Sequence, residues 1–89
     1  MGPEFNKYKQ TVYEVELYEG NDYEQMIDKY YSDTPLMAFS LGDVVNHQPK
    51  RGHESQARSY TVTLIRHLLV DDWPDGKNLH KLMVHLKRS

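Results

Sequence analysis

The sequence of 89 residues contains no cysteine and no long apolar run. Without cysteine, a disulfide scaffold, thiolate catalysis and cysteine-ligated zinc or iron–sulfur sites are excluded. No stretch approaches the roughly 20 apolar residues of a membrane-spanning helix, and no secretory signal opens the chain. We therefore expect an intracellular, cytoplasmic protein. A net charge of only −2 argues against a chain that is cationic throughout, as many nucleic-acid coat proteins are.

Motifs of known catalytic sites are also missing. The chain has no glycine-rich phosphate loop, no Gly-x-Ser-x-Gly and no His-Glu-x-x-His. The spacing of the five histidines matches no metal signature. We therefore expect a protein that is not an enzyme and that holds neither a cofactor nor a metal.

The length predicts one domain. Residues 1–5, Met-Gly-Pro-Glu-Phe, are typical of a protease-site and linker scar left by expression, so we place the single domain at 6–89. That size lies close to the lower limit for a domain that folds without disulfides or metals.

The first half of the chain predicts a strand, a short helix and a second strand. Residues 8–19 alternate with a period of two, which predicts a half-buried strand that ends at Gly20-Asn21. Four apolar residues then recur at helical spacing and predict a helix that stops before Pro35: Tyr23, Met26, Ile27 and Tyr30. The apolar run 36–41 predicts the second strand, with a possible extension through residues 44–45.

The second half predicts a long loop, the longest strand and a final helix. Residues 46–58 are polar and interrupted by proline and glycine, and their length is typical of functional or mobile loops. Residues 59–70 are rich in β-favouring side chains. Alternation that turns Tyr60, Val62 and Leu64 inwards would also turn Arg66 inwards. Either a bulge therefore shifts the register or Arg66 lies at the rim of the sheet. After a turn at 71–76, four residues predict a helix capped by Asn78: Leu79, Leu82, Met83 and Leu86.

These elements predict an α+β fold with the order βαββα. Both helices have one apolar stripe, so we expect both to cover the same face of a three-stranded mixed sheet with strand order 1-3-2. The third strand is the most apolar, as suits a central strand. In element order alone, this arrangement is similar to a ferredoxin-like unit that lacks its last strand. The first strand would then present an unpaired edge, and the uncovered face of the sheet would be acidic.

This architecture predicts a small protein-binding module. The docking surface would be the edge of the first strand and its outward side chains, with two aromatic anchors; the expected residues are Val12, Glu14, Glu16, Tyr18, Tyr31 and Trp73. Small proteins without catalytic motifs are often modulators or inhibitors of a larger machine, such as viral or plasmid proteins directed at a host. A second copy could also pair with the first strand and produce a homodimer.

Two other functions remain open. Basic residues in the long loop and on the last helix could bind nucleic acid; they are Lys50, Arg51, Arg58, Lys81, His85 and Arg88. Alternatively, His47 and His53 could serve as the acid–base pair of a small hydrolase. No membrane partner is expected.

Overall fold

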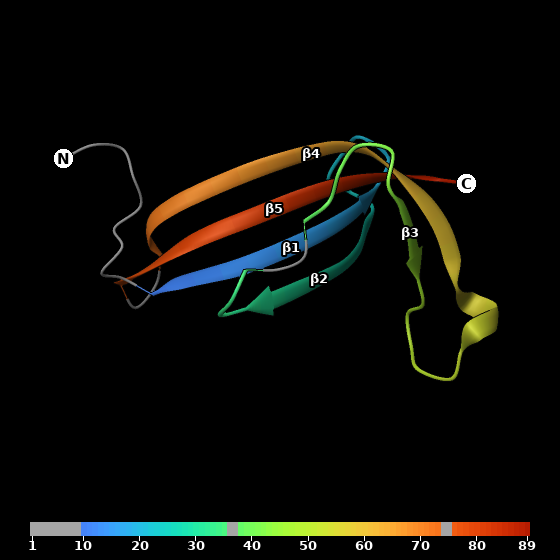
Figure 1. The fold of residues 1–89 in the computed structure, drawn as a ribbon, viewed down its shortest axis with the longest axis horizontal. Coiled ribbons are helices and arrows are strands. Elements are labelled where there is room, and N and C mark those ends of the chain that lie inside the picture. Colours follow the sequence, from blue (N-terminus) through green and yellow to red (C-terminus); the bar gives the residue numbers. More distant parts are fainter. Residues whose placement is uncertain (1–9, 36–37, 74–75) are drawn as a thin grey trace.

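The computed structural model describes residues 10–35, 38–73 and 76–89, except for the side chains of Asp72 and Trp73. The expression scar predicted at residues 1–5 lies outside this range. The elements are β1 (Thr11–Glu19), β2 (Met26–Ser32), β3 (Val44–His47), the 3₁₀ helix η1 (Glu54–Gln56), β4 (Arg58–Trp73) and β5 (Lys77–Arg88). The strands form one sheet in the order β2-β1-β5-β4-β3 (Figure 1). β1 and β5 are parallel, and every other pair of neighbours is antiparallel.

The predicted α+β fold is therefore wrong. Both segments expected to be helices are strands, β2 and β5, and no α-helix occurs in the described residues. Of the predicted strand at 36–41, residues 38–41 are not strand and 36–37 lie outside the described range; a strand forms at β3 instead. The sheet thus has five strands, and the order 1-3-2 does not occur. Nothing helical in the described part of the chain is long and apolar enough to cross a membrane.

The first strand is not at an edge. β1 pairs with β2 on one side and with β5 on the other, over nearly its whole length. Gly20, with a φ of 83°, ends β1 where the sequence predicts an end, because the chain must turn sharply towards β2 there. With both of its sides occupied, β1 cannot form the homodimer that the sequence predicts through this strand.

The hydrophobic core lies on the inner face of the sheet, which we define by Val15 and Leu17 of β1. These side chains pack with buried residues of β4 and β5: Tyr60, Val62, Val84 and Leu86. Partly buried side chains pack against this cluster: Ile27 of β2, Val45 of β3, and Phe39 from the connection between these strands. All five strands therefore contribute to a single core, which provides most of the driving force for folding.

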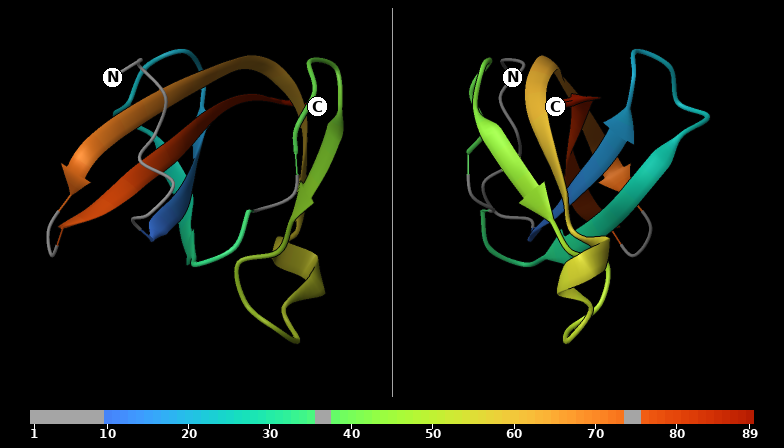
Figure 2. Two further views of the ribbon diagram at one scale, coloured as in Figure 1. Left: turned by 60° about the vertical axis from the view of Figure 1, so that its left-hand side comes forward. Right: turned by 90° about the vertical axis from the view of Figure 1, so that its right-hand side faces the viewer.

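The sheet curls towards its inner face. β4 arches and carries β3 round towards β2 (Figure 2). The two outermost strands are linked there, because Nε2 of His47 in β3 lies 3.0 Å from Oδ2 of Asp28 in β2. The domain is thus an open, curled sheet whose two outermost strands are joined at one point by a side-chain contact.

A bulge in β4 resolves the conflict at Arg66. The pairing of β4 with β5 shifts between Val62 and Leu64, so that Ile65 faces the core with Val62 while Leu64 and Arg66 face outwards. This is one of the two outcomes that the sequence left open. The bulge also adds to the bending of β4, because bulged strands kink and twist more strongly.

Candidate functional site

The predicted docking row on β1 is buried, contrary to expectation. Glu14, Glu16 and Tyr18 share the outer face of the sheet, as the alternation predicts, but they are only 3–4% exposed, and Val12 is half-buried. The neighbouring strands β2 and β5 supply the cover. Tyr31 of β2 is 61% exposed, and the side chain of Trp73 lies outside the described residues. The predicted surface is therefore not assembled on β1.

Two lysines neutralise the outer face of β1. Nζ of Lys29 lies 3.6 Å from both Glu14 and Glu16, and Nζ of Lys81 lies 3.9 Å and 3.4 Å from the same two carboxyl groups. The hydroxyl of Tyr18 donates to Oε1 of Glu16 at 2.5 Å. An acidic docking face does not exist here, because each glutamate is flanked by cations from both neighbouring strands.

The pKa values of the two glutamates are shifted in opposite directions. Burial raises the pKa of Glu14, and the hydrogen bond it makes with Glu16 raises it further. Burial also opposes ionisation of Glu16, but the hydrogen bonds from Tyr18 and Glu14 and the charge of Lys81 outweigh it, so the pKa of Glu16 is lowered. Of the two carboxyl groups, Glu14 therefore keeps its proton to the higher pH.

The basic residues predicted to bind nucleic acid do not form one surface. Lys81 is held by the two glutamates of β1, and His85 is fully buried with Nδ1 2.9 Å from the carbonyl oxygen of Gly20. The remaining four are exposed in or near the β3–β4 connection and at the end of β5: Lys50, Arg51, Arg58 and Arg88. Arg88 lies 3.4 Å from Glu19. Lys81 and His85 do share the outer face of β5, but ion pairs hold Lys81 against β1 and His85 is buried, so neither joins the four exposed basic residues.

The histidines of the predicted hydrolase are also in different settings. His47 contacts Asp28, and this hydrogen bond lowers the pKa of Asp28. His53 is exposed in the β3–β4 connection. Within the described ranges, no three histidine, aspartate or glutamate side chains lie close enough together to hold a metal ion.

The two unpaired sides of the sheet differ in how they are protected. On β2, the main-chain N–H of Lys29 donates to Oδ1 of Asp28 at 2.8 Å, and Oδ2 of the same carboxylate contacts His47 and the hydroxyl of Tyr30. Asp28 therefore occupies part of the hydrogen-bonding edge of β2. Inward-turned charged side chains of this kind are a common protection of edge strands.

Among the described residues, no side chain protects the long strand β4 in this way. β3 pairs with it only between Arg58 and Thr61, and Val62 makes two further main-chain bonds, to Gly42 and Asp43. From Thr63 onwards, no strand within the described part of the chain pairs with that side of β4. Leu68 and Leu69 are 44% and 59% exposed on this stretch. The sequence predicts β4 as a central strand with partners on both sides, and the four-residue length of β3 is what leaves the rest of this side without a partner strand in the described part of the chain.

Comparison of the chain with protein-family models, with curated proteins and with solved structures found no match.

Proposed function

We propose that this chain is a small, non-enzymatic protein-binding module that pairs an extended segment of a partner protein with β4. The unpaired stretch of β4, residues 63–71, carries the proposal. It spans roughly 30 Å at about 3.3 Å per residue, enough for a bound strand of ordinary length. The acidic face of β1 has no part in this proposal, since its carboxyl groups are buried and neutralised.

Strand addition suits this stretch for two physical reasons. Unpaired main-chain N–H and C=O groups offer a ladder of hydrogen bonds to any extended peptide. The exposed Leu68 and Leu69, on opposite faces of the strand, add apolar area that a partner would remove from water. The charges along the stretch are mixed, with Arg66 on one side of the two leucines and Asp71 at the end of the stretch, which favours a polypeptide over a polyanion.

The proposed role follows from the mode of binding. A domain of this size that adds a strand to another protein would cover or immobilise a segment of that protein. We therefore propose that it acts as a modulator or inhibitor of a larger assembly.

The test compares two charge substitutions at exposed aliphatic positions. Leu69→Lys places a charge on the unpaired stretch of β4, and Val44→Lys places the same charge on β3, where the side chain is 66% exposed. Tagged wild type and both variants capture protein from a lysate of the source cell, with and without nuclease treatment. We expect Leu69→Lys to lose most of the captured protein and Val44→Lys to retain it, with all three showing the same circular dichroism.

Amide hydrogen exchange of the purified complex then locates the contact. Strand addition predicts slower exchange for main-chain amides within residues 63–71. Equal capture by Leu69→Lys, or protection confined to other strands, contradicts the proposed edge. Capture that disappears with nuclease supports nucleic-acid binding instead.

A further inference from the structure

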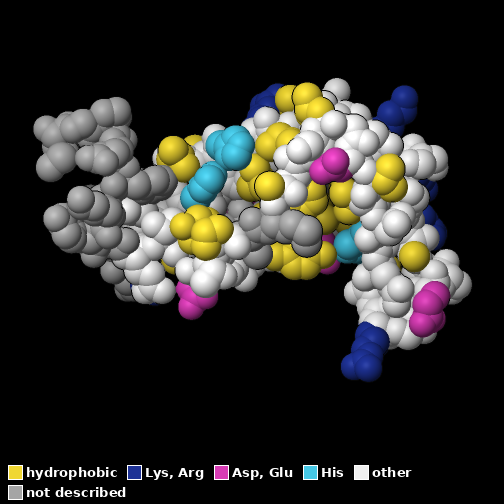
Figure 3. Space-filling model, in the orientation of Figure 1, with side chains coloured by type: hydrophobic (Ala, Val, Ile, Leu, Met, Phe, Trp, Pro, Cys, Tyr) yellow, Lys and Arg dark blue, Asp and Glu magenta, His cyan; other side chains and the backbone are white. Residues whose placement is uncertain are grey.

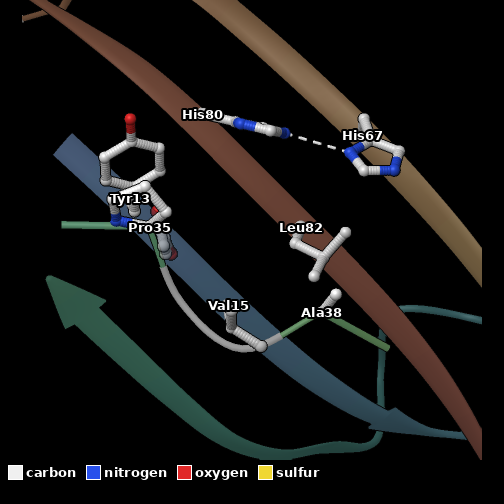
Figure 4. Close-up of a pocket in the computed structure, with 8 residues that line it drawn as sticks. Tyr13, Val15, Pro35, Ala38, His67, His80 and Leu82 are labelled. Carbon is white, nitrogen blue, oxygen red and sulfur yellow. Dashed lines mark hydrogen bonds between the residues drawn. The ribbon is translucent and has the colours of Figure 1, made fainter. Parts of the chain in front are cut away.

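A cavity of about 170 Å³ opens on the inner face of the sheet. Tyr13 and Val15 of β1, His80 and Leu82 of β5 and His67 of β4 line it (Figure 4). Ala38, from the connection between β2 and β3, lies on the opposite side. Histidine side chains lie beside hydrophobic ones on the face of the molecule shown in Figure 3. The cavity is thus mostly apolar, and its polar lining consists of the two imidazoles and Glu14, whose carboxyl group contacts Lys29 and Lys81.

The two imidazoles form one hydrogen-bonded unit. Nδ1 of His67 lies 3.0 Å from Nε2 of His80, a distance at which one nitrogen donates and the other accepts. If His67 donates, Nδ1 of His80 carries the remaining proton and Nε2 of His67 is an acceptor. In the other tautomer these roles are exchanged. In either case the neutral pair offers one further donor and one further acceptor.

The surroundings favour a neutral occupant. Burial and the neighbouring His67 lower the pKa of His80, which disfavours a positive charge on that imidazole and so disfavours an anionic occupant beside it. A divalent metal would find only two neutral ligands in a mostly apolar wall. The described residues contain no third histidine, aspartate or glutamate in range to complete such a site.

The volume fixes the size of the occupant. A cavity of about 150 Å³ in another protein is known to hold one benzene ring, so about 170 Å³ admits a single six-membered ring with a small substituent. The ring of Tyr13, 6.0 Å from that of His80 and tilted by 53°, provides an aromatic wall.

We propose that this cavity binds a neutral single-ring aromatic molecule that carries one hydroxyl group, of which phenol is the simplest. The ring lies against Val15, Leu82 and Tyr13, and the hydroxyl group hydrogen-bonds to the His67–His80 pair. This site faces the inside of the curled sheet and requires no partner protein, and it shares only His67 with the stretch of β4 at which strand addition is proposed.

The test titrates the whole purified chain with three probes at pH 7.5: phenol, benzene and benzoate. We expect saturable 1:1 binding of phenol by calorimetry, with NMR shifts centred on His67, His80 and Tyr13. Benzene should bind about fivefold more weakly, the loss expected for one hydrogen bond, and benzoate should not bind, because its charge enters an apolar cavity without a cation.

Substitutions separate this site from non-specific binding. His80→Ala should weaken phenol about fivefold and abolish the preference over benzene, whereas His53→Ala, at an exposed histidine of the β3–β4 connection, should change neither. If His80→Ala unfolds, Ala38→Leu serves instead, because it fills the cavity from a loop and should abolish binding of both rings. Phenol that fails to shift the His67 and His80 resonances at millimolar concentration overturns the proposal. So does phenol binding that is unchanged in Ala38→Leu.

Discussion

The two faces of β1 are equally shielded from water but are built from opposite chemistry. On the inner face Leu17 is 3% exposed and packs against other apolar side chains. On the outer face Glu16 is 4% exposed and is surrounded by a tyrosine hydroxyl, a second carboxyl group and two ammonium groups. The inner face gains from leaving water, whereas the outer face must replace every contact with water that it loses. Exposure alone therefore says little about what each side chain contributes.

The largest effect is expected from the inner face. Leu17→Ala removes buried methyl groups and leaves a cavity that all five strands surround, so we expect a loss of about 3 kcal/mol in the free energy of unfolding. Urea denaturation followed by circular dichroism measures it. Val44→Ala, at an exposed position of β3, is the matched control and should cost less than about 0.5 kcal/mol. A similar loss in both variants would contradict the assigned core.

A smaller effect is expected when the charge of the outer face is removed. Glu16→Gln keeps the shape and an acceptor for Tyr18 but leaves Lys81 with a weaker counter-charge, so we expect a loss of about 1–2 kcal/mol, reduced by the partial exposure of both lysines. Adding Lys81→Met should recover part of that loss. Additive losses in the double variant would show that the two side chains do not interact.

The hydroxyl group of Tyr18 should contribute less again. Tyr18→Phe keeps the ring, which lies 5.4 Å from His85 in a stacked arrangement, and removes only the hydrogen bond to Glu16. We expect a loss of about 1 kcal/mol by urea denaturation. The pKa of Glu16 should also rise in this variant, because one of the hydrogen bonds that lowers it is gone. If NMR shows that the pKa of Glu16 is the same in this variant as in the wild type, the hydrogen bond from Tyr18 does not lower it.

The smallest effect at neutral pH is expected from Glu14→Gln. We expect the free energy of unfolding to change by no more than about 0.5 kcal/mol, because burial disfavours the ionised form of the carboxyl group that this substitution removes. Its signature is pH dependence. The folded pKa of Glu14 is raised, so the folded state binds more protons, and wild-type stability should fall as pH rises above about 4.5 through that pKa. Glu14→Gln should remove this fall.

Glu16 and Asp28 have lowered pKa values, so they act in the opposite sense. Their contribution is present above their unfolded pKa and is lost as pH falls through the folded one. Stability profiles of wild type and Glu14→Gln between pH 3 and 8 therefore separate the two carboxyl groups. Identical profiles would refute the raised pKa of Glu14.

The sequence was sufficient to predict β1 and β4 but not β5. Alternation identified β1 and correctly assigned Glu14 and Val15 to opposite faces, and the β-favouring run at 59–70 lies within β4. β5 is central and buried on both faces, so its apolar residues do not alternate, and Leu79, Leu82, Met83 and Leu86 fit a helical stripe equally well. Local spacing cannot decide between the two, because pairing with β1 and β4 decides it.

The candidate site was mispredicted for the same reason. Whether Glu14 and Glu16 meet water depends on Lys29 and Lys81, which reach them only because β2 and β5 are strands on either side of β1. Nor could the length of the unpaired stretch of β4 be derived without knowing that β3 spans four residues. The bulge near Arg66, by contrast, was foreseeable, since a charged residue interrupts a strictly alternating pattern.

The parallel pairing of β1 with β5 has a consequence for the order of folding. Thr11 stands opposite Asn78, so the middle of the sheet joins the first and last strands of the domain. During synthesis, almost the whole domain must leave the ribosome before β1 can pair with β5. Closing the loop between these two strands costs chain entropy before any of their hydrogen bonds has formed. We therefore expect slow refolding for a chain of this size, and no native sheet in a fragment that stops before Lys77.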